Sequence, residues 1–332
     1  MQKCFFLFSI FFSIQALAQD STFNSLMQGM ESKQAIQKPV VKIFESERLI
    51  NANTTELVGK GRMVFRVIHN FYDVAGSAGG IKNFFGLDNA ADIKISFQTG
   101  LGKRLDMITS RVRGAENYQT GFSRVQKLWE LGFKYKFTEQ RKDDPSHPLS
   151  IALFANMVVS SMPSSTFVAP YTDSAETTFN KFSDRLSQAI QLIVARKFGK
   201  VSVQLIPSFV HRNRIIPGDD KSIFALGGAA RIPLTRSIAF IVDYFHVFHS
   251  QAAKDFYKNP NSAVHPSIKF YDPLGVGFEI TTAGHVFHLN FTNATEILEN
   301  RFIPRTVTSW GKGQFRWGFT ISRTFVLWRE KH

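Results

Sequence analysis

Histidines spaced three residues apart are the first candidates for chemistry in this sequence. His285 and His288 form one such pair, and His246 and His249 form another. On a helix this spacing places two imidazoles on one face, where both can reach one metal ion. On a β-strand the same spacing places them on opposite faces. Because both pairs lie in strand-like segments, we predict no metal site, with His285 in a turn and His288 on an inner wall.

A serine hydrolase centre is a second candidate. Such a centre needs a nucleophilic serine, a histidine base and a polar group that orients the histidine. His288, Asn290 and Ser322 share one predicted face on neighbouring strands. Polar residues are abundant inside any barrel, and no nucleophile turn accompanies Ser322. We therefore expect no enzyme, and a lipid hydrolase is the least favoured function.

Two carboxylates and a glycine run complete the candidate sites. Asp88 and Asp92 lie in the aromatic stretch FFGLDNAAD, but their spacing matches no calcium loop. We expect this stretch to be a loop that folds over a barrel mouth. The run AGSAGG at 75–80 lacks the Lys and the helix of a phosphate loop, so we interpret it as a flexible connection. The sequence predicts no cofactor.

Charged and polar residues recur opposite large apolar ones, which assigns them to two faces. The predicted lumen-lining residues are Arg66, Lys94, Gln98, Lys134, Lys136, Gln204, Glu279, His288, Asn290 and Arg316. The predicted lipid-facing residues are Phe133, Tyr135, Phe240, Phe287, Phe291, Phe315, Trp317 and Phe319. One interpretation is that the inner residues pair with one another and fill a narrow lumen. The other is a basic constriction that selects a small polar or anionic solute.

The elements that must position these residues are strands of about ten residues that alternate apolar and polar positions. A soluble sandwich and a transmembrane barrel share this period. The connections distinguish the two, because short turns such as GLGK and GK alternate with long polar loops from about Arg62 onward. Outer-membrane barrels have this pattern of periplasmic turns and extracellular loops. We count roughly 12 strands, an even number as in bacterial barrels.

One segment, FSDRLSQAIQLIVARKFG at 182–199, fits an amphipathic helix nearly as well as a strand. The turn at Gly199 and the strand-like segment after it favour a hairpin. The stretch VVKIFESERLI at 40–50 could be a further strand, although it would break the even count. We therefore treat residues 19–60 as a periplasmic N-terminal segment that either plugs the barrel or adds a strand.

The N-terminus predicts export. Lys3, the apolar run from Phe5 to Ile14 and the small residues Ala16 and Ala18 fit a signal peptide over residues 1–18. The run is too short for a membrane-spanning helix. The only cysteine, Cys4, lies inside the predicted signal peptide, so we expect no disulfide in the exported chain. The net charge of +14 comes with no nucleic-acid-binding motif, so we expect no nucleic-acid partner.

Several phrases resemble a family of outer-membrane β-barrel proteins known only as a domain of unknown function. They are FFGLDNA, QLIVARKFGKVSVQLIPSFVHRN, LGVGFEITTAGHVFHLNFTNA, RFIPRTVTSW and GFTISRTF. The resemblance covers the chain from about Arg62 to Phe325. The resemblance implies a barrel in a Gram-negative outer membrane and carries over no ligand, reaction or catalytic residue. One departure is Ala283, where a second glycine is expected.

The sequence therefore predicts one all-β, antiparallel transmembrane barrel over residues 61–328, with a periplasmic tail at 329–332. The expected partners are outer-membrane lipid, the barrel-assembly machinery and a small solute. The leading function is a narrow channel or uptake barrel. The alternative is a structural or partner-binding barrel with a plugged lumen, and ordered loops together with a filled lumen would favour it.

Overall fold

Strands are the predominant secondary structure of the described residues. In the computed structural model the described residues are 38–76, 79–88, 90–114, 127–165, 176–258 and 268–328. Within these ranges the strands are β1 (Arg62–Asp73), β2 (Ala90–Gly100), β3 (Leu105–Gly114), β4 (Lys127–Thr138), β5 (Ser150–Ser160), β6 (Leu186–Phe198), β7 (Val201–Arg212), β8 (Ser222–Pro233), β9 (Ile238–Phe248), β10 (Leu274–Thr281), β11 (His285–Thr292) and β12 (Arg316–Val326). The predicted signal peptide at 1–18 lies outside the described residues.

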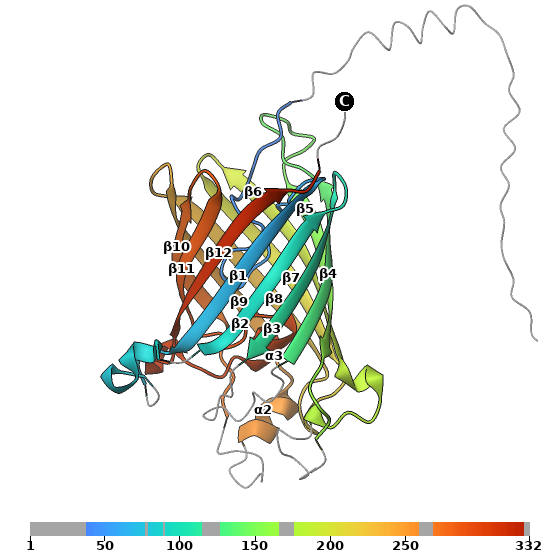
Figure 1. Ribbon diagram of the computed structural model, residues 1–332, viewed down its shortest axis with the longest axis vertical. Coiled ribbons are helices and arrows are strands. Elements are labelled where there is room, and N and C mark those ends of the chain that lie inside the picture. Colours follow the sequence, from blue (N-terminus) through green and yellow to red (C-terminus); the bar gives the residue numbers. More distant parts are fainter. Residues whose placement is uncertain are drawn as a thin grey trace, which may run out of the picture. The chain divides into compact units, whose positions relative to one another are not determined.

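Each strand pairs with its sequence neighbours, and β1 pairs with β12, so the sheet is a closed barrel (Figure 1). All these pairings are antiparallel, and β1 meets β12 in register from Arg62 opposite Val326 to Asn70 opposite Gly318. Closure leaves no unpaired strand edge. The predicted fold class, a single antiparallel barrel of about 12 strands, is confirmed. The ambiguous segment is a strand, β6, as the hairpin argument predicted.

Along each strand, side chains that point into the barrel alternate with side chains that point out of it. In β4, Leu128, Glu130 and Lys134 are buried, whereas Trp129 and Phe133 are exposed. This burial pattern follows from the two-residue period of a strand. None of the helices among the described residues is long and apolar enough to cross a bilayer.

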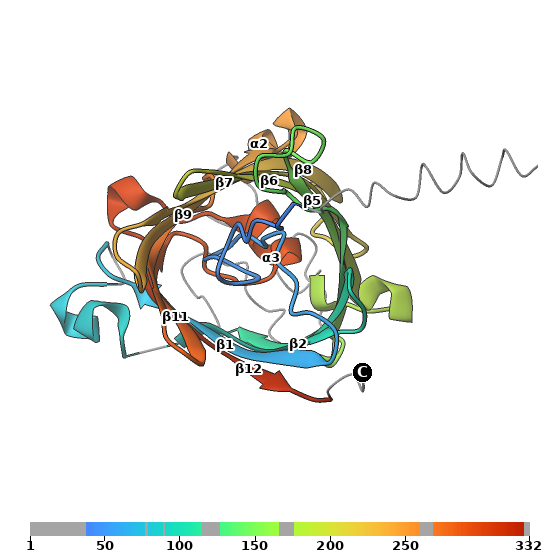
Figure 2. The ribbon, with the colours of Figure 1, turned by 90° about the horizontal axis from the view of Figure 1, so that it is seen from above.

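The connections differ in length at the two ends of the barrel. We call the end where β2–β3, β6–β7, β8–β9 and β10–β11 are joined the short-turn end, and the opposite end the long-loop end. The long loops carry the helices η1 (Ile81–Gly86), η3 (Phe182–Arg185), α2 (Gln251–Lys258), α3 (Glu299–Arg305) and η4 (Trp310–Lys312). All seven residues of α3 are buried, and Figure 2 shows this helix within the ring of strands.

The expectation that FFGLDNAAD folds over the barrel mouth is wrong. Its η1 helix projects away from the barrel at the long-loop end, outside the ring in both views (Figures 1 and 2). Ile81 is 75% exposed, and Phe84 and Phe85 are 59% and 45% exposed. Both phenylalanines have positive φ, at 44° and 53°, which is unusual for a bulky residue. The turn therefore directs its apolar side chains outward rather than toward the lumen.

Candidate functional site: the filled lumen

An N-terminal segment, residues 41–58, lies inside the barrel, and we call it the plug. It contributes no strand to the sheet; one isolated bridge, between Arg48 and Asn53, lies within it, and bridges at Val40 and Lys60 flank it. The amide of Val41 donates to the carbonyl of Gln140 in the β4–β5 connection, and Gly61 donates to Gly100 before the β2–β3 turn. Both ends of the plug therefore lie at the short-turn end. Figure 2 shows it as the blue coil inside the ring.

The deepest part of the plug is bound by a single carboxylate of β9. Asp243 Oδ2 accepts the backbone N–H groups of Ile50, Asn51 and Ala52 at 3.1, 2.7 and 3.1 Å. Its Oδ1 accepts the side-chain amide of Asn51 at 2.9 Å. Asp243 is fully buried. Hydrogen bonds to a buried charge are stronger than hydrogen bonds between neutral groups. The plug therefore supplies the hydrogen-bond donors that the Asp243 carboxylate needs, and the carboxylate holds the plug in place.

Helix α3 reaches the plug from the long-loop end. Arg48 forms a buried ion pair with Glu299, and its second guanidinium nitrogen donates to the carbonyl of Ile297 at 2.9 Å. Asn53 donates at 3.0 Å both to Glu299 and to Gln191 of the barrel wall. The plug and the α3 loop enter from opposite ends, so this contact joins the two segments inside the barrel.

Apolar packing holds one side of the plug. The side chains of Ile43, Phe44, Leu49 and Ile50 are 0–5% exposed. They belong to one buried cluster with inward residues from β3, from β5 to β9 and from α3. The wall members are Ile108, Phe154, Ala189, Ile193, Ala195, Ile206, Val210, Ile223, Ala225, Ala229, Ile241, Phe245 and Val247. This half of the lumen wall is apolar, unlike the wall of a water-filled channel.

Gly275 of β10 shows how closely the plug approaches the wall. A Cβ atom built at this glycine would lie 2.8 Å from Cγ2 of Ile50 and 2.9 Å from Nδ2 of Asn51. Real Cβ atoms essentially never approach so closely. The wall therefore needs glycine at this position for the plug to fit.

The predicted lumen-lining residues all face inward and are at most 7% exposed. The charged ones have charged partners or bind the plug. The ion pairs are Arg66–Glu47, Lys94–Glu130 at 2.7 Å, Lys136–Glu139 at 3.5 Å, Glu279–Arg231 at 2.6 Å and Arg316–Asp73 at 2.7 Å. Lys134 donates to the carbonyl of Glu47 at 2.8 Å, and Gln204 donates to the carbonyl of Asn53 at 2.8 Å. Gln98 donates to Asp106 at 2.8 Å.

The predicted lipid-facing residues have the opposite parity. Phe133 and Tyr135 are 43% and 40% exposed. The side chains of Phe240, Phe287, Phe291, Phe315, Trp317 and Phe319 are half-buried by their neighbours on the outer wall. Phe315 precedes β12 and stacks on Trp310 with ring centroids 4.5 Å apart.

The histidine and aspartate candidates do not form a metal site. His288 contacts Glu279 at 3.2 Å inside the lumen, whereas His285 stacks on Phe287 at the short-turn end. Asp92 faces inward and accepts the amide of Ile297, while Asp88 lies in the η1 loop. Among the described residues no group of three His, Cys, Asp or Glu side chains could hold a metal ion.

The proposed hydrolase trio is not assembled either. Ser322 Oγ donates to the carbonyl of Val286 at 3.2 Å, and His288 pairs in register with Thr320 rather than with Ser322. Within the described ranges no hydrogen bond joins His288, Asn290 and Ser322 to one another.

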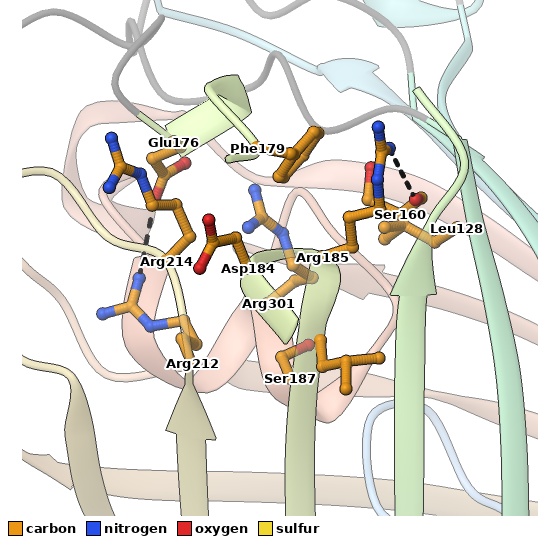
Figure 3. Close-up of a pocket in the computed structure, with 11 residues that line it drawn as sticks. Leu128, Ser160, Glu176, Phe179, Asp184, Arg185, Ser187, Arg212, Arg214 and Arg301 are labelled. Carbon is orange, nitrogen blue, oxygen red and sulfur yellow. Dashed lines mark hydrogen bonds and ion pairs between the residues drawn. The ribbon is translucent and has the colours of Figure 1, made fainter. Parts of the chain in front are cut away.

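A cavity lies at each end of the filled lumen, lined by described residues. One, of about 310 Å³, lies at the short-turn end between the plug residues Lys42, Glu45 and Glu47 and the ends of β10, β11, β12 and β1. The other, of about 30 Å³, lies at the long-loop end under Phe179 (Figure 3). A volume of 30 Å³ admits about two water molecules and no solute.

The lining of the smaller cavity is charged but internally paired. Arg212 forms an ion pair with Asp219 at 3.0 Å, and Arg301 donates to Glu296 at 3.0 and 3.2 Å. Arg305 of α3 forms a buried pair with Glu176. Burial raises the pKa of Asp219, against the attraction of Arg212. These pairs neutralise much of the charge around the cavity.

Sequence reasoning missed Asp243, Arg48 and Glu299. In RSIAFIVDYF, Asp243 lies at an inward-facing position among apolar residues. A single carboxylate on such a face was the sequence feature that could have identified it. Arg48 and Glu299 lie in segments without strand periodicity and 251 residues apart, so no local pattern connects them.

The comparison with protein families agrees with this architecture. The family model described as "Membrane bound beta barrel domain (DUF5777)" matches residues 44–325. No curated protein matches the chain.

Among solved structures it is similar to the NanC porin, with a TM-score of 0.42, 8% identity and coverage of 79% of this chain and 98% of that one. It is also similar to an outer membrane channel from Pseudomonas putida F1, with a TM-score of 0.43, 12% identity and coverage of 86% and 100%. A third, LpxR from Salmonella typhimurium, has a TM-score of 0.31, 10% identity and coverage of 80% and 99%. With a family match that spans most of its length, the chain belongs to the DUF5777 family of membrane-bound β-barrel domains.

Proposed function

We propose that this chain is an outer-membrane barrel with a permanently filled lumen, and that it acts by binding a partner at its long-loop end. The alternation of short turns and long loops supports an orientation with the long loops outside the cell. The exposed apolar side chains of the η1 loop support a contact at this end, because soluble surfaces seldom expose such groups.

The observation that carries the proposal is the apolar burial of the plug. Four large side chains, Ile43, Phe44, Leu49 and Ile50, are withdrawn from water. Each contributes about 1.5–3 kcal/mol, so extracting the plug costs roughly 6–12 kcal/mol before the contacts of Asp243 and Glu299 are counted. Gating transitions involve differences of a few kcal/mol. The plug therefore behaves as part of the barrel core rather than as a gate.

A disulfide between the plug and the wall tests this proposal. In the variant Asn51→Cys/Thr292→Cys, made with Cys4→Ser, a disulfide can join the plug to β11, because Asn51 Nδ2 lies 3.2 Å from Thr292 Oγ1. We expect wild type, the oxidised variant and the reduced variant to be equally silent in a planar bilayer. Conductance in wild type and in the reduced variant would overturn the proposal, and its loss in the oxidised variant would show that conduction requires the plug to move.

The partner is tested separately on intact cells. A photo-crosslinking residue at Phe84, on the exposed η1 turn, is expected to give a discrete covalent adduct. The same residue at Ile238, on the outer wall at the short-turn end, is the control. Equal adduct patterns at the two positions would contradict recognition at the long-loop end.

A second candidate is a narrow uptake channel for a small polar or anionic solute. The cavity of about 310 Å³ at the short-turn end favours it, because polar side chains and Lys42 line a space large enough for a small solute. The channel requires the plug to move, so the same disulfide distinguishes the two functions. Solute-dependent conductance in the reduced variant and its absence in the oxidised variant would support the channel.

A further inference from the structure

Three basic side chains gather on the outer face of the barrel at the long-loop end. Arg111 and Arg113 belong to β3, and Lys127 begins β4. Val112 and Leu128 are 1% and 5% exposed, so they point inward and their neighbours point outward. We call Arg111, Arg113 and Lys127 the basic patch.

The strand register places like charges next to each other. Arg113 lies directly opposite Lys127, and Arg111 lies directly opposite Trp129. Opposed residues of an antiparallel pair have Cβ atoms about 4.5–5.5 Å apart, and like charges in such a pair are destabilising. Arg111 lies two residues from Arg113 on the same face, about 7 Å away. Three positive charges thus converge on one small area.

No carboxylate compensates this repulsion in the part of the chain that the structure describes. Arg111 donates to Ser161 Oγ at 2.9 Å and lies over the Trp129 ring at 4.9 Å, and both partners are neutral. The outward neighbours on the flanking strands are Ile93 and Ile95 of β2 and Val159 of β5. Inside the barrel, in contrast, basic residues such as Lys94 and Arg316 have carboxylate partners.

The surroundings of the patch indicate its ligand. Trp129 is 55% exposed, and exposed tryptophans of a membrane barrel occupy the level of the lipid headgroups. Below the patch on β4 the outward residues are Leu131 and Phe133, which are apolar. Lipid headgroups supply anions at this height. The planar guanidinium groups of Arg111 and Arg113 match the oxygens of a phosphate.

We propose that the basic patch binds the phosphate groups of an anionic lipid of the outer leaflet. Binding replaces the repulsion between Arg113 and Lys127 with charge-assisted hydrogen bonds. The acyl chains of the lipid then lie along the apolar outer wall of β3 and β4. This site is independent of whether the lumen conducts.

The test measures lipid affinity with a matched control. The full chain is placed in phosphatidylcholine nanodiscs, bisphosphorylated lipid A is titrated in, and bound lipid is counted by native mass spectrometry. The test variant is Arg111→Gln/Arg113→Gln/Lys127→Gln. The control is Arg196→Gln/Arg323→Gln, which removes two outward arginines at the short-turn end, where each lies over a phenylalanine ring at 4.7 and 5.2 Å.

We expect the triple variant to bind lipid A on the order of 100-fold more weakly, at about fivefold per charge. The control should stay within about twofold of wild type. Lipid A stripped of its phosphates should bind wild type as weakly as lipid A binds the triple variant. Equal binding by wild type and triple variant, or equal losses in triple variant and control, would overturn the proposal.

Two further measurements separate the alternatives. Inorganic phosphate should not displace lipid A, and displacement at millimolar phosphate would assign the patch to a free anion instead. In lipid-free detergent the triple variant should melt at or above the wild-type temperature, because it lacks the like-charge repulsion. A lower melting temperature would contradict that repulsion. In that case the single variant Arg113→Gln decides whether the patch binds lipid, because it should weaken lipid binding about fivefold.

Discussion

Buried carboxylates are the residues that close this lumen. Asp243 accepts three successive backbone amides of the plug, and Glu299 accepts Arg48 and Asn53 from the same segment. A further set of carboxylates, including Glu130 and Asp73, neutralises basic residues of the wall. The inner wall therefore carries little uncompensated charge, although the chain as a whole is strongly basic.

The first residue-scale prediction concerns Asp243. Asp243→Ala leaves the amides of Ile50, Asn51 and Ala52 buried without an acceptor. We expect the free energy of unfolding to fall by at least about 3 kcal/mol, because each of these buried donors left without an acceptor costs about 1–3 kcal/mol. Hydrogen–deuterium exchange should show loss of protection at residues 50–52.

Asp255→Ala is the control for this change. Asp255 lies on the exposed surface of α2, where it accepts Gln251 at 2.8 Å. Its removal should change stability by no more than about 0.5 kcal/mol. If the two variants exchange equally fast at residues 50–52, Asp243 does not fix the plug.

At the scale of the element, β12 shows how one strand serves two environments. Arg316, Gly318 and Thr320 are buried toward the lumen, and Phe319 and Ile321 lie on the outer wall. Phe319 stacks on His69 of β1 with ring centroids 5.4 Å apart, across the seam that closes the barrel. Arg323 and Phe325 continue the outer face toward the short-turn end. The strand thus passes from an apolar band to a charged rim.

The prediction for β12 compares one substitution at two depths. Phe319→Arg places a charge in the expected lipid band, which costs about 2–4 kcal/mol near the midplane. Phe325→Arg makes the same change on the same face near the rim, where the cost is about 0–1 kcal/mol. Urea unfolding in lipid vesicles measures both. Equal losses at the two positions would contradict the assignment of the outer face to lipid.

At the scale of the whole barrel unit, the long loops form one connected structure. Arg305 of α3 contacts Glu176 in the β5–β6 loop and Asp219 in the β7–β8 loop. Asp220 accepts the amide of Ser250 at 2.9 Å, which joins the β7–β8 loop to the β9–β10 loop. His249 stacks on Phe270 at 4.0 Å within this assembly. Changes in one loop should therefore affect the stability of all of them.

The pH dependence of stability tests this connection. Burial lowers the pKa of His249 to about 4, with Asp220 and Asp272 opposing and Arg212 and Lys254 reinforcing the shift. The unfolded chain binds a proton near pH 6.5, so the folded form loses stability as the pH falls from about 6.5 to about 4. The loss attributable to His249 is at most about 3 kcal/mol.

His249→Phe preserves the stacked ring and removes the proton. Its free energy of unfolding should be flatter than that of wild type across this pH window, as measured by chemical denaturation at a series of pH values. Parallel profiles for the two proteins would show that His249 does not limit the stability of the loop assembly.

The sequence by itself determined the barrel. Side chains alternate between two faces along a strand, so the shared face of Trp129, Leu131 and Phe133 in β4 follows from their spacing alone. The turn at Gly199 correctly indicated a hairpin, and the alternation of connection lengths implied an even ring. Each of these signals is local, which is why the fold class and the direction of the lumen residues could be read before any contact was known.

Only the tertiary structure decided what fills the ring. The plug and α3 have no period, and their partners lie on distant strands, as in the contact of Arg48 with Glu299. The inward Ile193, Ile206 and Ile241 hinted at an apolar lumen, but a sequence does not say which segment covers them. Likewise the alternation separated Arg113 and Lys127 from the lumen, while only the register placed the two charges opposite each other. The face on which a strand side chain lies follows from local backbone geometry. The segment that fills the lumen and the register of the strands depend instead on contacts between residues far apart in the chain.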